Sequence, residues 1–174
     1  MEDLFKRFEK FGDRAKKGKQ DVVERIIKEL SIHAAIEEAV LYPSIRAAVD
    51  DKKLDELVLE ALEEHHIVKW TLSELDGMSP DIERFDAKVT VLIESVRHHV
   101  EEEEKELFPK MAKAFGKERL NELGDALAEA KKAAPTRPHP MMPDEPPGNV
   151  LAAPGAALVD RALDAGRKLV GARR

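Results

Sequence analysis

HAAIEEAVLYP at residues 33–43 returns in the same register as HVEEEEKELFP at residues 99–109. The paired positions are His33 and His99, Glu37 and Glu103, Glu38 and Glu104, Leu41 and Leu107, Tyr42 and Phe108, and Pro43 and Pro109. On a helix, residues four apart lie one above the other, so each copy directs an imidazole and a carboxylate at one point. Two such copies facing each other are one way in which a helical bundle holds a pair of transition-metal ions. The repeat therefore predicts a duplicated metal-ligand helix.

The composition favours helices and excludes several kinds of site. The 174 residues are enough for one domain of common size, and 43% are hydrophobic, 37% charged and 5% aromatic, as is typical of amphipathic helices. Cysteine is absent, which excludes disulfides, cysteine-ligated zinc and iron–sulfur clusters and is compatible with a reducing cytosol. The formal charge of −6 gives no indication of nucleic-acid binding.

The ends and the hydropathy of the chain give an expectation of its location. The first ten residues, MEDLFKRFEK, are charged and lack the apolar region of a signal peptide. No apolar run approaches the roughly 18 residues that a bilayer span needs. We therefore expect a soluble, cytoplasmic protein.

Apolar spacing predicts an all-α, up-down four-helix bundle. The first helix frays over residues 12–19. The second begins at about Asp21 and reaches the first copy of the repeat, where Pro43 kinks or closes it.

The third and fourth helices are indicated by their end signals. Asp50 and Asp51 are N-cap residues for the third helix, which stops at Asp76–Gly77. Residues 79–81, Ser-Pro-Asp, combine a cap, a proline suited to the first turn and an acid favoured by the helix dipole. They predict the start of the fourth helix.

Three segments complete the expected organisation. A shorter helix runs from about Lys117 to Ala133, so that residues 1–134 form the bundle. Residues 135–155 are rich in proline and should be an extended linker or a strap lying on the bundle. Residues 156–174 predict a basic amphipathic helix, which we expect to dock on the bundle, on a second subunit or on an anionic membrane surface. Its basic residues are Arg161, Arg167, Lys168, Arg173 and Arg174.

Five polar residues interrupt the apolar stripes at the stripes' own spacing. They are His33, Glu37, His65, His99 and Glu103. Burying an uncompensated carboxylate costs several kcal/mol, so a bundle core accepts these groups only if something neutralises them. A metal pair does so, because imidazole and carboxylate suit iron and manganese and a bridging Glu shares its charge between two ions. We therefore predict these five residues as metal ligands.

Neighbouring histidines are less suited to the same role. His65 and His99 continue the apolar stripes, whereas His66 and His98 fall beside them and are expected at the rim or as partners of the ligands. A single His four residues before a Glu is common as a surface pair or a satisfied core histidine. The metal interpretation depends on two copies in register with a third His on the helix between them.

Other residues near the motifs have simpler interpretations. Glu38 and Glu104 are interpreted as a solvated acidic face, although they adjoin the ligand positions and a supporting role stays open. Tyr42 is interpreted as packing, because its counterpart in the repeat is a Phe. Trp70 and the Phe residues are interpreted as core, and His139, in the proline-rich segment, as incidental.

Three motifs together carry a family resemblance. The pattern HxxxEExxLYP at 33–43, EEHHIVKW at 63–70 and HxxxEExxLFP at 99–109 resembles the hemerythrin-like, or HHE cation-binding, domain family of the bacterial type, over roughly residues 1–115. The resemblance implies a four-helix bundle that holds two non-haem iron ions. It implies that His33 and His99 are terminal ligands on opposite ions, Glu37 and Glu103 bridging carboxylates, and His65 the ligand from the third helix.

Two positions depart from the family's pattern. The family places another His about six residues before an L-F-x-R-F stretch, which here is residues 4–8, so the expected position falls before Met1. Glu2 and Asp3 are weak substitutes at a frayed end. Lys69 stands four residues after His65, where oxygen-carrying hemerythrins have a second His. Both departures imply a site poorer in nitrogen ligands and argue against reversible oxygen carriage.

Three functions follow for this pattern. The first is a metal-binding protein that binds or senses oxygen, nitric oxide or iron itself. The second is a di-iron enzyme that consumes peroxide or nitric oxide. The third is a metal-free interaction bundle that uses its terminal helix for self-association or surface docking. The expected partners are a metal ion and a small diatomic or peroxide ligand, with no nucleic acid.

Overall fold

The computed structural model describes residues 1–48 and 51–171, with side chains up to residue 164, and every regular element in these ranges is helical. Two of the elements, η1 and η2, are single π-helical turns, which are wider than α-helical ones. The elements are α1 (Glu2–Glu9), α2 (Lys16–Ile36), η1 (Glu37–Leu41), α3 (Tyr42–Ala48), α4 (Lys52–Leu75), α5 (Phe85–Glu102), η2 (Glu103–Leu107), α6 (Phe108–Ala114), α7 (Lys117–Ala133) and α8 (Gly148–Gly171).

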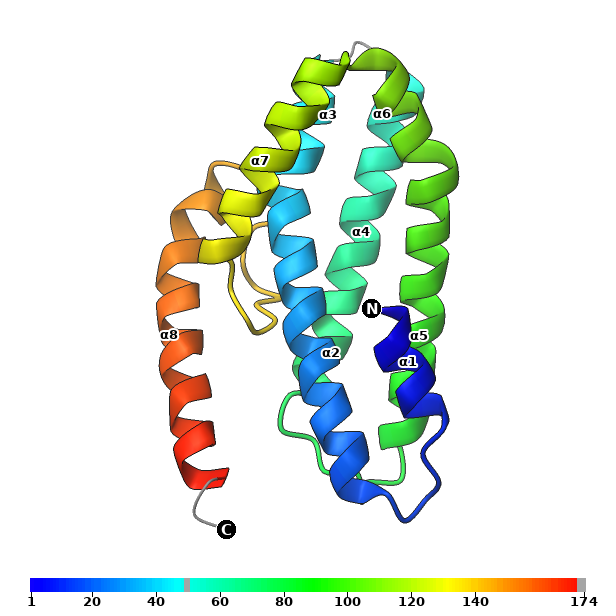
Figure 1. Ribbon diagram of the computed structural model, residues 1–174, viewed down its shortest axis with the longest axis vertical. Coiled ribbons are helices and arrows are strands. Elements are labelled where there is room, and N and C mark those ends of the chain that lie inside the picture. Colours follow the sequence, from blue (N-terminus) through cyan, green and yellow to red (C-terminus); the bar gives the residue numbers. More distant parts are fainter. Residues whose placement is uncertain (49–50, 172–174) are drawn as a thin grey trace.

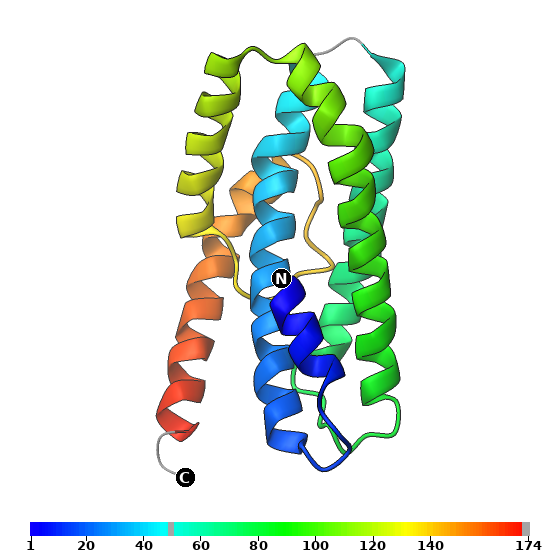
Figure 2. The same cartoon turned by 45° about the vertical axis from the view of Figure 1, so that its right-hand side comes forward.

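The predicted up-down four-helix bundle is confirmed (Figure 1). The helices α2, α4 and α5 run side by side with alternating direction, and the short α1 packs against α2 as the fourth wall. Because α1 has only eight residues, it is about 12 Å long and covers only part of the bundle's length. Its amino end lies about halfway along the bundle, while α7 and α8 lie outside α2 (Figure 2).

The apolar core consists of two clusters separated by a polar layer. The first cluster is built from α1 and from α2, α4 and α5 where they surround it, with members such as Leu30, Val68 and Val96. The second lies toward the other end of the bundle and includes Leu41, Ala61 and Leu107. The three long helices, with η1 and η2 continuing α2 and α5, therefore run from one cluster to the other. The predicted ligand positions fall in between.

One residue predicted as core lies outside it. Trp70 is 45% exposed, and its indole N–H donates to His66 Nε2 at 3.1 Å. Both residues lie beside the apolar stripe of α4, four positions apart, so they pair with each other at the surface. Phe5, Phe8 and Phe85 are buried as predicted.

The second bundle helix begins earlier than the sequence indicates. The prediction of a start at about Asp21 is wrong, because α2 begins at Lys16. Tertiary contacts account for the extra residues: Lys19 is buried, and the Phe11 ring packs against Gly18 so closely that an added Cβ would lie 2.8 Å from Phe11 Cε1. These contacts hold a segment helical although its own composition predicts fraying.

The predicted start of the fourth bundle helix at Ser79 is also wrong, because α5 begins at Phe85. Ser79 Oγ does accept the Asp81 N–H at 3.2 Å, but two successive turns follow instead of a helix. In these turns the Ile82 N–H donates to Ser79 and the Phe85 N–H donates to Ile82. Phe85 is fully buried, so the helix starts where its side chain enters the core.

The end signals of α4 act as predicted. The Asp51 carboxylate accepts the N–H groups of Lys53 at 2.9 Å and Leu54 at 3.3 Å. Gly77 follows the helix with a φ of +85°, a conformation that glycine adopts without a steric penalty. Asp50, the other predicted cap, lies outside the described residues.

The last helix also begins earlier than predicted. The bounds of α7 agree with the sequence, but α8 begins at Gly148 instead of Ala156 and contains Pro154. Asn149 is buried and donates to the Glu38 carbonyl at 3.1 Å, so a tertiary contact fixes a start that the proline content argues against.

The segment between α7 and α8, residues 134–147, has no regular secondary structure and is called the strap below. Arg137 anchors it by donating to Asp76 and Asp164, all at 2.7 Å, and Asp160 accepts the backbone N–H groups of Thr136 and Arg137 at 2.9 and 3.0 Å. The strap lies beside α2 (Figure 2).

The terminal helix α8 contacts both α7 and the strap. Arg161 donates to the Lys132 carbonyl of α7, and His139, predicted as incidental, lies 3.1 Å from the Asp160 carboxylate. The side chains of Arg167, Lys168, Arg173 and Arg174 lie outside the described residues. None of the helices in the described ranges combines the length and apolar character that a bilayer crossing requires.

The caps give a test of the fold. Asp51→Ala should lower the free energy of unfolding by about 1 kcal/mol, because two N–H groups lose their acceptor. Ser79→Ala is the matched control and should cost less than about 0.5 kcal/mol, since no helix starts there. Urea unfolding of both variants measures the difference, and equal losses would contradict the assignment.

Candidate metal centre

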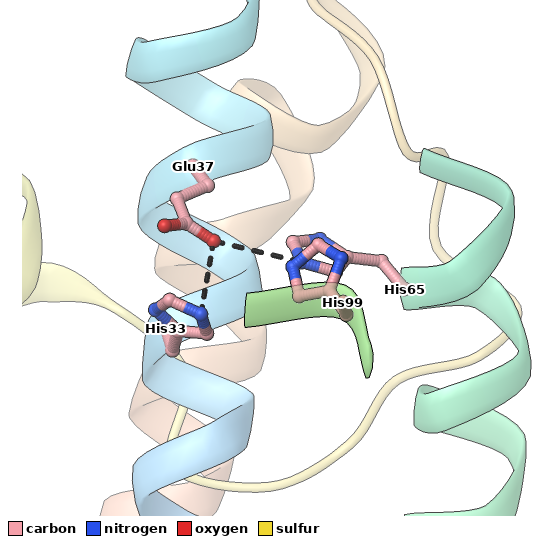
Figure 3. Close-up of side chains that lie close together, drawn as sticks. All are labelled: His33, Glu37, His65 and His99. Atoms are coloured by element: carbon pink, nitrogen blue, oxygen red, sulfur yellow. Dashed lines mark hydrogen bonds and ion pairs between the residues drawn. The ribbon is translucent and has the colours of Figure 1, made fainter. Parts of the chain in front are cut away.

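Three helices bring the predicted ligands together in the layer between the two apolar clusters (Figure 3). His33 lies in the last turn of α2 and Glu37 opens η1, while His65 comes from the middle of α4 and His99 from the last turn of α5. One donor atom from each of these four residues lies within 4.8 Å of the other three. Glu103, which opens η2, places Oε2 3.6 Å from His99 Nε2.

The group is shielded from water except at one side. His65, His99, Glu37 and Glu103 are buried, whereas the His33 side chain is 35% exposed. Buried ionisable groups are rare unless they are paired or bind a metal. The layer is therefore costly to keep within an apolar core unless a cation balances its carboxylates.

Both copies of the repeat place their Glu at the start of a π-turn. The backbone N–H of Tyr42 donates to Glu37, and that of Phe108 to Glu103, each across five residues instead of four. A proline follows each turn, at 43 and 109. In a regular helix the proline ring would clash with the carbonyl four residues earlier, and the wider turn avoids the clash. Pro43 therefore widens the helix instead of closing it.

Carboxylates fix the orientation of the two buried imidazoles. His65 Nδ1 lies 3.2 Å from Glu38 Oε1, and His99 Nδ1 lies 2.7 Å from Glu64 Oε2. Since a carboxylate only accepts, each imidazole donates a proton through Nδ1, and a neutral imidazole in this position has its lone pair on Nε2. The two Nε2 atoms face each other at 3.1 Å. Two lone pairs at this distance repel unless a cation lies between them.

Glu37 adds a third electron-rich atom at the same place. Its Oε2 lies 3.2 Å from His33 Nε2 and 3.5 Å from His65 Nε2 (Figure 3). Among the described residues this buried oxygen has no hydrogen-bond partner. Imidazole nitrogens and a carboxylate oxygen converging on one point form the donor set of a transition-metal ion. The residues present therefore fit a metal ion.

Burial keeps the imidazoles ready to bind a cation. It lowers the pKa of His33 to about 3, with His65 and His99 adding to the shift, and it lowers the pKa of His65 well below its ordinary value. Burial, together with the nearby Glu103, raises the pKa of Glu37 well above its usual range. Burial also raises the pKa of Glu103, against the effect of His99. In the metal-free protein Glu37 is thus protonated more readily than an ordinary carboxyl.

Tyr42 belongs to the site although it was interpreted as packing. It is buried, its hydroxyl donates to Glu103 Oε1 at 2.9 Å, and its Oη lies 3.4 Å from His65 Nε2. Burial and the nearby Glu37 raise the pKa of Tyr42, so it keeps its proton. The signal available in the sequence was the difference between the copies, since Phe108 has no hydroxyl.

Glu38 also belongs to the site, and its interpretation as part of a solvated face is wrong. It is buried, and the Lys69 ammonium lies 2.9 Å from its carboxylate. Burial raises the pKa of Glu38 to about 7, and Lys69 opposes that shift. Lys69 lies on the same stripe of α4 as His65, so a lysine at a core position was the signal. Glu104, the counterpart of Glu38, is exposed as predicted.

The remaining candidates lie outside the buried group. The His66 side chain is 41% exposed, and His98 forms a surface group with Glu64 and Glu102, whose donor atoms lie within 4.8 Å of one another. Glu2, a possible substitute ligand, is held by Arg97 at 2.9 Å.

A comparison with protein families agrees with this geometry. The family model described as "Hemerythrin HHE cation binding domain" matches residues 1–111. The chain belongs to this family. It is therefore a cation-binding domain of the hemerythrin type, and the resemblance inferred from the three motifs is confirmed.

Two curated proteins illustrate the range of relatives. An uncharacterized hemerythrin-like protein of Schizosaccharomyces pombe is 29% identical over 140 residues, which cover 80% of this chain and 68% of that protein. A DNA nickase of Nostoc sp. is 30% identical over 112 residues, which cover 64% of this chain but 31% of the nickase. No solved structure gives a significant match.

Cation affinity should rise with pH. Because the pKa of Glu37 is raised, the metal-free site takes up a proton there more readily than an ordinary carboxyl does, and a cation must displace it. His33, with a pKa of about 3, has no proton to release. Titration calorimetry with Zn²⁺ in buffers of different ionisation enthalpy should therefore find that protons are released on binding. A pH-independent affinity without proton release would contradict the assignment.

Proposed function

We propose that the chain holds non-haem iron in this centre and that the iron binds a small diatomic molecule, oxygen or nitric oxide, as a sensor or binding protein. The observation that carries the proposal is the convergence of the His65 and His99 Nε2 atoms with Glu37 Oε2 at one buried point. Membership of a cation-binding family supports a metal there, and the nitrogen-rich donor set favours iron over a hard cation such as Mg²⁺.

The ligand assignment follows from the distances. Because their donor atoms converge, His33, Glu37, His65 and His99 would hold one ion, whereas the family resemblance places His33 and His99 on opposite ions. Glu103, beside His99, offers a carboxylate that would serve a second ion. We propose that each chain binds two iron ions. The ratio of iron to protein in the purified sample measures this number. Bound iron supplies a redox-active position for a diatomic or peroxide ligand. The protein contributes an apolar surrounding that excludes water and carboxylates that keep the imidazoles oriented.

A second function, consumption of peroxide or nitric oxide, is favoured by Tyr42. Its hydroxyl is buried, keeps its proton and lies 3.4 Å from His65 Nε2, where it is placed to donate a hydrogen bond to a ligand at the centre. Such a donor is useful in turnover and is not needed for metal binding alone. We do not extend strand cleavage from the nickase, because the match covers 31% of that protein and this chain carries a net charge of −6.

Iron content tests the proposed centre. Protein purified aerobically after expression with added iron should contain iron and absorb in the near-ultraviolet, whereas Glu37→Gln should lose most of the metal. Glu104→Gln, at the exposed position in the other copy, is the matched control and should keep it. Colourless, metal-free wild-type protein would contradict the proposal and favour a metal-free interaction bundle.

The same Glu37→Gln variant should be more stable than wild type without metal. Since the pKa of Glu37 is raised on folding, the wild-type residue costs stability above the ordinary carboxyl pKa, and Gln removes that cost. The expected gain near pH 7 is about 1 kcal/mol or more. Urea unfolding of both metal-free proteins measures it, and a loss of stability would show that the Glu37 carboxyl is satisfied without a cation.

Tyr42→Phe separates binding from turnover. Because the ring is kept, iron content should stay near the wild-type value, while steady-state peroxide consumption should fall by about 100-fold if the hydroxyl donates a hydrogen bond to the reacting peroxide. Phe108→Tyr, at the paired position, should change neither. Equal rates in wild type and Tyr42→Phe, or no turnover in wild type, would exclude the enzymatic function.

A further inference from the structure

The strap, which lies beyond the family-matched residues 1–111, reaches the support of the metal centre. Asp144 of the strap contacts Lys69 Nζ, and its other oxygen lies 3.3 Å from His66 Nδ1. Asn149, in the first turn of α8, donates to the Glu38 carbonyl at 3.1 Å and to the Asp144 carbonyl at 3.3 Å. The segment is thus held against η1 and α4 where both carry site residues.

These contacts form a continuous chain that ends at a predicted ligand. Asp144 contacts Lys69, the Lys69 ammonium lies 2.9 Å from the Glu38 carboxylate, and Glu38 Oε1 lies 3.2 Å from His65 Nδ1. Lys69, Glu38 and His65 are all buried. No other carboxylate among the described residues contacts Lys69, so Asp144 and Glu38 together fix the position of its ammonium.

The chain of contacts determines which nitrogen of His65 faces the cation. A flexible lysine side chain holds Glu38 in place only if its own position is fixed, and Asp144 fixes it from the opposite side. Glu38 then accepts the Nδ1 proton of His65, which leaves the Nε2 lone pair for a metal. Without Asp144, the lysine has one partner in place of two, and the hold of Glu38 on His65 weakens.

We propose that Asp144 is a positioning residue of the metal centre, so that the strap forms part of the metal site in this chain. The inference rests on the proposed cation binding at His65 Nε2. Because coupling between two events is reciprocal, a cation bound at the centre also holds the strap more firmly in place.

Two measurements test the proposal. In the metal-free protein, ¹⁵N NMR of His65 should show a protonated Nδ1 in wild type and a shift toward the other tautomer in Asp144→Asn. In the second, Zn²⁺ affinity measured by chelator competition should fall about 10-fold in Asp144→Asn, as is usual for a lost support of a ligand. Asp144→Glu should restore much of both signals, because the carboxylate is kept.

Glu145→Gln is the matched control, since this neighbouring acid of the strap pairs with Arg46 at 3.2 Å and not with Lys69. It should leave the His65 tautomer unchanged and the affinity within about twofold of wild type. Asn149→Ala removes the other contact with Glu38 and should weaken Zn²⁺ binding without any change of charge. Circular dichroism checks that each variant is folded.

The outcomes separate this inference from the proposed function. If Asp144→Asn keeps the wild-type tautomer and affinity, or if Glu145→Gln loses as much, the positioning role is overturned while the metal centre stands. If wild type binds no cation, the proposed function fails, and the His65 tautomer in the metal-free variants still decides whether Asp144 positions the ring.

Discussion

The contact on which the rest of the structure depends is the one between His65 and His99, whose Nε2 atoms face each other. Their separation of 3.1 Å is set from outside, because Glu38 and Glu64 hold the Nδ1 atoms of His65 and His99. Glu37 adds a buried oxygen without a hydrogen bond. Burial lowers the pKa of His33 and His65 and raises that of Glu37, so charge in the metal-free layer is reduced while the repulsion between lone pairs remains. A cation would attract the facing lone pairs and the Glu37 oxygen that has no hydrogen bond. For this reason the layer fits a binding site better than an apolar core.

The bundle supplies this layer through a duplicated helix whose copies have the same backbone and different surroundings. In both copies a π-turn carries the Glu and a proline follows it, so the ligands arrive with similar geometry. The neighbours differ: the Tyr42 hydroxyl donates a hydrogen bond to Glu103, whereas its counterpart Phe108 has no hydroxyl. Glu38 is buried against Lys69, whereas Glu104 is exposed. The duplication therefore explains the ligand set, and its differences explain how the two sides of the centre are specialised.

The sequence predicted which polar residues the fold brings together but not the residues that support them. His33, Glu37, His65, His99 and Glu103 could be predicted as one group because helical periodicity places them on the inner stripes. Glu38 and Glu104 occupy equivalent places in the repeat, and only the strap and Lys69, which face one copy, distinguish them. The starts of α2, α5 and α8 were missed for the same reason: buried Lys19, Phe85 and Asn149 fix them through contacts with distant segments. Local periodicity carries no information about such contacts.

X-ray absorption at the iron edge of aerobically purified protein tests most directly whether His65 and His99 bind iron through Nε2. We expect nitrogen and oxygen atoms bound directly to the iron, with the multiple-scattering pattern of imidazole. In His99→Ala the imidazole pattern should be weaker. A shell without imidazole, or a spectrum that His99→Ala leaves unchanged, would contradict it.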